Sequence, residues 1–162
     1  MQKALFASGC FWGTEYHFKK QAGVLETSVG FTGGHIKNPA YREVCRGTTG
    51  HAEAVEVKYD PSVVSYETLA KLFFETHDPT QLNRQGPDVG TQYRSEVFVY
   101  DNEQREVITR LIDQLRSDGL DVKTQISPAG PYYRAEEYHH DYYNKTGGSP
   151  YCHIYTKRFA DE

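Results

Sequence analysis

The sequence predicts a single α+β domain in which helices pack against a mixed sheet. The first observation is the order of the local patterns, which runs strand, helix, strand, strand, helix, strand and continues with a further helix and strand. The second is the length of 162 residues, which suits one domain with a sizeable core. The third is that no linker, repeat or low-complexity tract divides the chain. We therefore expect one domain over residues 1–162, built as a ferredoxin-like α/β plait.

The first half of the chain supplies three expected strands and one helix. Continuous apolar residues from Ala4 to Ala7 indicate the first strand, and Phe11 and Phe18 recur at helical spacing after it. Gly33-Gly34 ends the second strand. In order, the expected elements are a strand at 2–8, a helix at about 11–20, a strand at 24–31, a loop at 35–50 and a strand at 51–59.

The second half is expected to be mainly helical, with long loops. Apolar residues at core spacing, from Val107 to Leu115, make the segment 102–117 the clearest helix of the chain. Two prolines and two glycines mark a long loop before it. In order, the expected elements are a helix at about 65–76, a loop at 77–91, a strand at 94–100, a helix at 102–117, a short strand near 121–126, a short helix through 136–144 and a long coiled, mobile tail from about 145.

Composition excludes several classes of function. The net charge is −4 and there is no long basic run, which argues against nucleic acid or an anionic membrane surface as a partner. No stretch approaches the ~18 apolar residues of a membrane span. The N-terminus lacks the apolar core of a signal peptide, and three scattered cysteines suit thiol chemistry in a reducing compartment. We expect a cytoplasmic monomer.

The stretch from Ser8 to Glu15 holds the first candidate for chemistry. Ser8 is placed to cap the helix at 11–20, which would put Cys10 in its first turn. Free backbone N–H groups and the helix dipole favour an anion there and lower a thiol pKa. The neighbouring Phe11 and Trp12 offer an apolar cradle. The alternative is that Cys10 is a small buried core residue.

Glu53 is the second candidate. Alternation along the strand at 51–59 puts Glu53 on the same face as Val55, Val57 and Tyr59. A carboxyl on an apolar face is costly when charged, so its pKa should rise until the group is partly protonated at neutral pH. A neutral carboxylic acid can donate a proton. The alternative is a buried salt bridge with an arginine or a lysine.

Four ordered motifs resemble those of the type A peptide methionine sulfoxide reductases, over nearly the whole chain. The matching segments are Gly9-Cys10-Phe11-Trp12-Gly13, Gly47-Thr48-Thr49-Gly50-His51-Ala52-Glu53, His77-Asp78-Pro79-Thr80, and Asn83-Arg84-Gln85-Gly86 with Asp88-Val89-Gly90-Thr91-Gln92-Tyr93-Arg94-Ser95. The resemblance implies an α+β fold and reduction of the S epimer of methionine sulfoxide, free or in proteins.

The resemblance also assigns roles to particular residues. Cys10 would be the nucleophile that becomes a sulfenic acid and Glu53 the acid, with Tyr41 and Tyr93 binding the sulfoxide oxygen. The other implied site residues are Phe11 and Trp12 as the pocket wall and Asp88 as a residue that orients the substrate. Each tyrosine has a structural role as its alternative, because the chain contains 13 of them.

A second thiol must resolve the sulfenic acid. The resemblance suggests Cys152, which follows Gly147-Gly148 in a tail that could swing toward Cys10, with thioredoxin as the final reductant. Ser149-Pro150 departs from the usual residues before such a cysteine. We expect Cys45 to be buried packing, with a backup resolving thiol as the alternative.

Metal and cofactor chemistry are not indicated. The cysteines and histidines lack the spacing of a zinc site, and neither a P-loop nor a dinucleotide fingerprint is present. We expect no cofactor, so another protein must supply the reducing equivalents. Two other hypotheses remain open: a thiol peroxidase, and a binding module for methionine or aromatic side chains.

Overall fold

The computed structural model describes residues 1–148 and 153–159 of the chain. Six strands form one sheet in the order β7-β6-β1-β3-β2-β8, and β4 and β5 form a separate hairpin. The strands are β1 (Gln2–Ser8), β2 (Val24–Thr32), β3 (Ala52–Tyr59), β4 (Arg84–Gln85), β5 (Asp88–Val89), β6 (Ser95–Val99), β7 (Gln125–Pro128) and β8 (Tyr132–Arg134). The helices are α1 (Phe11–Lys19), α2 (Tyr41–Cys45), α3 (Tyr66–Glu75), α4 (Asn102–Ser117) and α5 (Tyr142–Thr146), with short 3₁₀ turns at Thr91–Tyr93 and Glu137–His139.

The sheet is mixed, as the sequence predicts. The pairs β6–β1, β1–β3, β3–β2 and β2–β8 are antiparallel, while β6 and β7 run parallel. The α+β class is therefore confirmed. The narrower plait architecture stays a prediction, and the chain order β1-α1-β2-β3-α3-β6 is the split βαβ order on which it depends.

Both faces of β1 are buried, which explains its continuous apolar sequence. Phe6 points into the larger core with Val55 and Val57 of β3. Leu5 and Ala7 point to the opposite face, where they pack with small side chains of β3 and with Phe98. Successive strand residues face opposite sides of a sheet, so a two-sided core requires apolar residues at every position.

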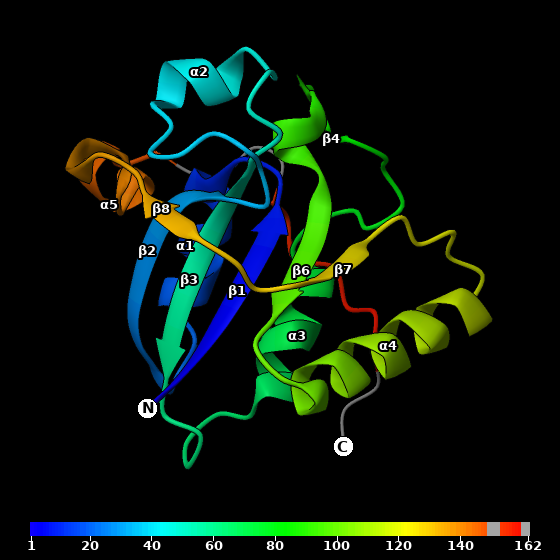
Figure 1. The fold of residues 1–162 in the computed structure, drawn as a ribbon. Helices are drawn as coiled ribbons and strands as arrows, with labels where there is room; N and C mark the ends of the chain where they lie inside the picture. The colour runs from blue at the N-terminus through cyan, green and yellow to red at the C-terminus, as the bar shows by residue number, and fades with distance from the viewer. Residues whose placement is uncertain (149–152, 160–162) are drawn as a thin grey trace.

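The sheet is strongly curled, as the very short connection between its two edge strands, β7 and β8, requires. In a flat sheet β7 and β8 would lie five strand spacings apart, about 24 Å. The chain from Pro128 to Tyr132 spans at most ~14 Å. The edges must therefore approach each other, and Figure 1 shows the β7–β8 connection crossing in front of the central strands.

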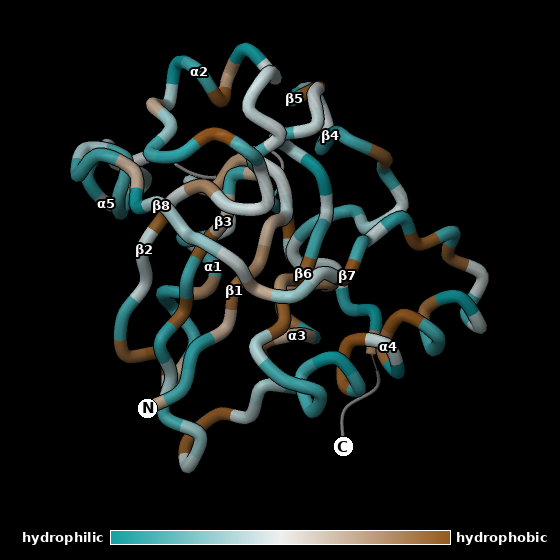
Figure 2. Tube along the Cα trace, in the orientation of Figure 1, coloured by the Kyte–Doolittle hydropathy of each residue, from teal (hydrophilic) through white to brown (hydrophobic). Residues whose placement is uncertain are grey.

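Helices α1 and α3 cover the face of the sheet that carries the side chain of Phe6. In Figure 1, α1 and α3 lie behind the strands, and their buried residues belong to the same core as Phe6. The side chain of Ser65 caps α3 and that of Asp101 caps α4, each accepting a hydrogen bond from a backbone N–H of the first turn. Figure 2 shows hydrophobic and hydrophilic residues alternating along α4, whose apolar side packs into the core.

The long elements match their predicted positions, and the short ones do not. The helix predicted at 102–117 has those bounds, and the strand predicted near 121–126 lies at 125–128. β8 was not predicted, and α2 and the β4–β5 hairpin lie within segments predicted as loops. Elements of two to five residues are held by their tertiary contacts, so local periodicity carries little signal for them.

The tail is described only in part. Residues 147–148 and 153–159 lie outside helices and strands, as predicted for a coiled tail. Cys152 lies outside the described residues, and the predicted mobility of the tail stays a prediction. Within the described ranges, no helix has both the length and the apolar character needed to cross a bilayer.

A substitution at Gly30 tests how closely β8 must approach β2 for the sheet to be stable. A Cβ at Gly30 would lie 2.4 Å from the carbonyl oxygen of Tyr133 and 2.7 Å from the ring of Tyr132. We expect Gly30→Ala to push β8 away and lower the free energy of unfolding by about 1–3 kcal/mol, measured by urea denaturation. Gly130→Ala, whose Cβ would meet no atom within 4 Å, is the matched control. Equal urea midpoints for the two variants would contradict this account.

Candidate active site

Cys10 lies at the junction of β1 and α1. It occupies the N-cap position of α1, and its side chain is buried, with 7% exposed. The prediction that Ser8 caps this helix is wrong, because Gly9 has a φ of +96° and turns the chain between them. The Ser8 hydroxyl instead hydrogen-bonds the Thr14 hydroxyl at 2.7 Å. Cys10 therefore precedes the first turn instead of lying in it.

The thiol of Cys10 is not activated at rest. Burial raises its pKa well above the usual value, and the carboxylates of Glu53 and Asp88 raise it further. The backbone N–H groups of Trp12 and Gly13 act in the opposite direction. The predicted lowering of the thiol pKa is wrong for this state, because burial, the largest cause, and the neighbouring acidic side chains outweigh the two N–H donors.

Glu53 lies directly beside the nucleophile position. It is the second residue of β3, pairs with Phe31 of β2 and is 1% exposed. Its Oε1 accepts a hydrogen bond of 3.2 Å from the backbone N–H of Phe11, the residue after Cys10. Its Oε2 is buried and has no hydrogen-bond partner among the described residues.

The environment of Glu53 favours its protonated form. Burial raises the pKa of the carboxyl to about 8, with a further contribution from Asp88, while the Phe11 N–H lowers it. Among residues 1–148 and 153–159, no lysine or arginine forms an ion pair with Glu53. The salt-bridge alternative therefore receives no support from the described part of the chain.

Tyr41 and Tyr93 approach the same carboxyl from different elements. Tyr41 begins α2, and Tyr93 ends the 3₁₀ turn at Thr91–Tyr93. Burial raises the pKa of both phenols, and the negative charge of Glu53 is the next largest cause for each. Both hydroxyls therefore stay protonated near Glu53 and can donate hydrogen bonds.

Aromatic rings form a wall beside Cys10. Phe11 is fully buried and lies 5.6 Å from Phe31 and 6.1 Å from Tyr41, between ring centroids. Trp12 is half-buried and stacks on Tyr142 at 3.9 Å. His139 also joins this wall, 4.3 Å from Tyr41 and 5.8 Å from Trp12.

Sequence reasoning missed His139 and Tyr142. The available signal is the run of aromatic residues from Tyr138 to Tyr143, a segment for which the sequence predicts only a short helix. Both residues reach Trp12 because the 3₁₀ turn at Glu137–His139 and helix α5 return the chain to α1. A contact between residues so far apart in the sequence leaves no local pattern.

Asp88 belongs to the β4–β5 hairpin, which lies over the Cys10 end of the sheet. It is half-buried, and its charge raises the pKa of Cys10, Glu53 and Tyr93. Gln85 of the same hairpin holds the loop down by accepting a 2.8 Å hydrogen bond from the backbone N–H of Asp78. The structure thus brings Asp88 to the predicted site.

Cys45 is exposed, so the prediction of a buried packing residue is wrong. It ends α2 with its thiol paired to the hydroxyl of Tyr41. Partial burial of the thiol raises its pKa, and the charge of Glu53 raises it further. The helix is a single short turn at the surface, which leaves its last residue open to solvent. Cys45 therefore lies at the rim of the predicted site.

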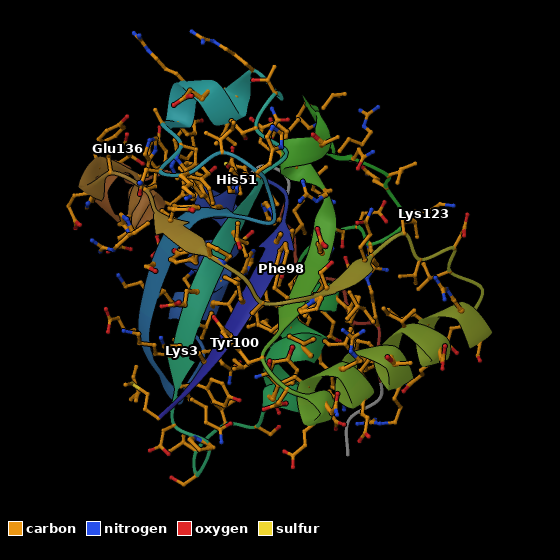
Figure 3. The ribbon with its side chains drawn as sticks, viewed as in Figure 1. Lys3, His51, Phe98, Tyr100, Lys123 and Glu136 are labelled. Carbon is orange, nitrogen blue, oxygen red and sulfur yellow. The ribbon has the colours of Figure 1, made fainter. Side chains whose placement is uncertain are left out.

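The described residues offer no cluster of three or more histidine, cysteine, aspartate or glutamate side chains that could hold a metal ion. A cavity of about 440 Å³ lies on the other face of the sheet, lined in part by His51 and Phe98. Both residues are labelled in Figure 3, and none of the predicted site residues lines this cavity.

Comparison with known proteins identifies the family of the chain. Residues 2–162 match the family model described as peptide methionine sulfoxide reductase. The chain is 50% identical to peptide methionine sulfoxide reductase MsrA of Nautilia profundicola over 152 residues, which cover 94% of this chain and 88% of the relative.

Solved structures give the same result. Reduced Mxr1 from Saccharomyces cerevisiae matches with a TM-score of 0.88 and 34% identity, over 95% of this chain and 91% of Mxr1. Mxr1 in complex with Trx2 matches with a TM-score of 0.63 and 25% identity, over 98% and 90%. The chain therefore belongs to the peptide methionine sulfoxide reductases, oxidoreductases that reduce methionine sulfoxide.

Proposed function

We propose that this protein reduces the S epimer of methionine sulfoxide, in proteins and as the free amino acid, with Cys10 as nucleophile and Glu53 as acid. The observation that carries the proposal is the hydrogen bond from the Phe11 N–H to Glu53 Oε1. It fixes a buried, largely protonated carboxyl one residue from the thiol. A nucleophile and an acid held side by side are what sulfoxide reduction requires.

The first step transfers oxygen from one sulfur to another. The Cys10 sulfur attacks the sulfoxide sulfur while Glu53 protonates the sulfoxide oxygen. The attack forms an S–S bond. On collapse, this bond and the S–O bond of the substrate break, and the protonated oxygen becomes bonded to the Cys10 sulfur as a sulfenic acid. The thiol proton of Cys10 passes to the Glu53 carboxylate, which restores the acid. The methionine sulfur gains two electrons and the cysteine sulfur loses two, so the step needs no cofactor.

The same proton limits how far the pKa of the Cys10 thiol is raised. The negative charge of Glu53 is the second largest cause of the raised Cys10 pKa. A protonated Glu53 removes this cause, and the N–H groups of Trp12 and Gly13 then stabilise the developing thiolate. Acid catalysis and activation of the nucleophile thus depend on one carboxyl.

The surrounding groups bind the substrate. We assign the hydroxyls of Tyr41 and Tyr93 to the sulfoxide oxygen, because both lie near Glu53 and stay protonated. Phe11 and Trp12 hold the methyl group by apolar contact, and Asp88 orients the rest of the substrate. The unpartnered Oε2 of protonated Glu53 would donate its missing hydrogen bond to the bound sulfoxide oxygen.

Resolution follows in a second step. The Cys152 thiolate attacks the sulfenic sulfur of Cys10, the S–O bond breaks, and hydroxide leaves as water after taking up a proton. The dithiol of thioredoxin then reduces the Cys10–Cys152 disulfide. The complex of the related Mxr1 with Trx2 supports this partner. A thioredoxin partner and an odd number of cysteines favour a cytoplasmic location.

Cys10→Ser tests the nucleophile and the stereochemistry together. With dithiothreitol as reductant, we expect the wild type to reduce S- but not R-methionine sulfoxide, and Cys10→Ser to reduce neither. Product methionine is measured by chromatography for each epimer. Peroxide consumption that far exceeds sulfoxide reduction would instead favour a thiol peroxidase, and tight binding of oxidised peptides without turnover would favour a binding module.

Glu53→Gln tests the acid. A glutamine preserves size and polarity but cannot donate a proton of comparable acidity, so we expect kcat/KM for S-methionine sulfoxide to fall about 10²–10⁴-fold. Glu56→Gln is the matched control, since Glu56 lies on the opposite face of β3 and is half-buried. Similar activity in the Glu53 and Glu56 variants would refute the acid role.

The raised pKa of Glu53 also predicts a pH dependence of stability. The unfolded chain releases this proton near the ordinary pKa of 4.5, whereas the folded chain keeps it until about pH 8. This stabilisation is complete below about 4.5 and is lost as the pH rises toward 8, by up to ~1.4 kcal/mol per pH unit. In urea unfolding, the wild type should lose stability relative to Glu53→Gln across this window. Parallel curves for the two proteins would contradict it.

A further inference from the structure

The two tyrosines that we assign to the sulfoxide oxygen lie on elements too short to be stable by themselves. Tyr41 begins α2, a helix of five residues, and Tyr93 ends a 3₁₀ turn of three residues. A single helical turn is marginal in water, because few hydrogen bonds offset the ordering of its backbone. Contacts with the rest of the chain must therefore fix where the two hydroxyl groups lie.

The turn that carries Tyr93 is fixed to β6. The guanidinium of Arg94 donates a hydrogen bond of 2.9 Å to the carbonyl oxygen of Thr91, and it forms an ion pair of 2.7 Å with Glu96 of β6. Glu96 is buried, with 4% of the residue exposed, so separating this pair would leave a buried charge uncompensated. Tyr93 is therefore attached to a well-held part of the sheet.

Gln92 reaches from this turn to α2. Its side chain is buried, with 5% of the residue exposed, and its Nε2 donates a hydrogen bond of 3.2 Å to the carbonyl oxygen of Cys45, the last residue of α2. Since that carbonyl can only accept, the amide must turn its Nε2 toward Cys45. Its Oε1 has no hydrogen-bond partner among the described residues. The bond to Cys45 therefore sets the orientation of the amide.

Two glycines leave room for this amide. A Cβ on Gly90, just before the 3₁₀ turn, would lie 2.8 Å from Cδ of Gln92 and closer still to Oε1. Gly90 also has a φ of +145°, which favours glycine. A Cβ on Gly47, which lies just after α2, would be 3.7 Å from the same Oε1. The amide is thus packed between the start of the turn and the end of the helix.

Cys45 connects this contact to Tyr41. The hydrogen bond between the two side chains opposes ionisation of the phenol and favours that of the thiol, so the Tyr41 hydroxyl is the donor. Burial and the charge of Glu53 raise the pKa of Tyr41 most, and the bond to Cys45 and the nearby Tyr93 raise it further. The two phenols therefore lie close together, and a shift of Cys45 would move one hydroxyl relative to the other.

We propose that Gln92 is a positioning residue for oxygen transfer, which holds the end of α2 to the 3₁₀ turn so that the hydroxyls of Tyr41 and Tyr93 converge on the sulfoxide oxygen. The proposal rests on the role of these tyrosines in the proposed function. Gln92 acts through Cys45 and does not touch the substrate. Two donors that are held in place before the substrate binds need no reorganisation while the S–O bond breaks.

Gln92→Met is the direct test, because methionine keeps the length and approximate volume of glutamine but cannot donate to the Cys45 carbonyl. The protein is mixed with excess S-methionine sulfoxide without reductant, and the methionine formed in the first turnover is measured over time. This rate constant reports oxygen transfer, since recycling of the enzyme does not enter it. We expect it to fall about tenfold at saturating substrate, because a donor is misplaced but not removed.

The decisive comparison uses Tyr41→Phe. If Gln92 acts by positioning the Tyr41 hydroxyl, Gln92→Met should slow the reaction less than about twofold once that hydroxyl is gone. Equal fractional losses in the two backgrounds would overturn the positioning role alone. A first turnover as fast in Tyr41→Phe as in the wild type would overturn the assignment on which the proposal rests, and a wild type that forms no methionine would overturn the proposed function itself.

Two further variants separate positioning from general damage. Gln104→Met is the matched control, because Gln104 is 6% exposed and its amide makes two hydrogen bonds to backbone groups, one of them to Lys3 at the end of β1 far from Cys10. It should lower the urea midpoint at least as much as Gln92→Met does, with first-turnover methionine formation within about twofold of the wild type. An equal slowing in both variants would contradict a specific role of Gln92.

Gln92→Asn keeps the test valid if Gln92→Met does not fold. Asparagine retains the amide, but its side chain is one carbon shorter and cannot reach the Cys45 carbonyl in the same way. We expect the same loss of first-turnover rate as in Gln92→Met, and the same disappearance of that loss when Tyr41→Phe is added. A Gln92→Asn variant with the wild-type rate would overturn the positioning role.

Discussion

The structure depends on burying the carboxyl of Glu53. The alternation of β3 directs this side chain into the core with Val55 and Val57, where a charge is costly and a proton is retained up to about pH 8. One hydrogen bond from the Phe11 N–H offsets part of that cost. Because this N–H belongs to the start of α1, the acid and the thiol of Cys10 are held by the same helix terminus.

This buried environment explains why the Cys10 thiol keeps its proton before substrate binds. A thiol that is buried, with the carboxylate of Asp88 nearby, keeps its proton, and it is the thiolate that oxidants attack. A helix N-terminus alone would expose a permanently activated cysteine. Placing the acid next to the thiol makes reactivity depend on the protonation of Glu53, and therefore on the same proton that the sulfoxide oxygen must receive.

The long elements of the fold and the position of Glu53 in the site could be predicted from the sequence, because the patterns that determine them are local. The alternation around Glu53 and the periodicity of α4 both survive in the structure. The cap of α1 and the pKa of Cys10 could not be predicted, since the first depends on the φ of Gly9 and the second on carboxylates 43 and 78 positions away in the chain. The exposure of Cys45 and the contact of Tyr142 with Trp12 likewise follow from tertiary structure.

Gly13 shows how one position can serve two purposes. Its N–H points to the Cys10 thiol, while the space where a side chain would lie is taken by His153. Alanine is a better helix former than glycine, so local helix propensity would favour a substitution here. Any side chain would, however, displace the imidazole, since a Cβ at Gly13 would lie 2.1 Å from Nδ1 of His153. The glycine is therefore a requirement of the tail and not of the helix, and it connects the helix of the nucleophile to a residue 140 positions after Gly13 in the chain.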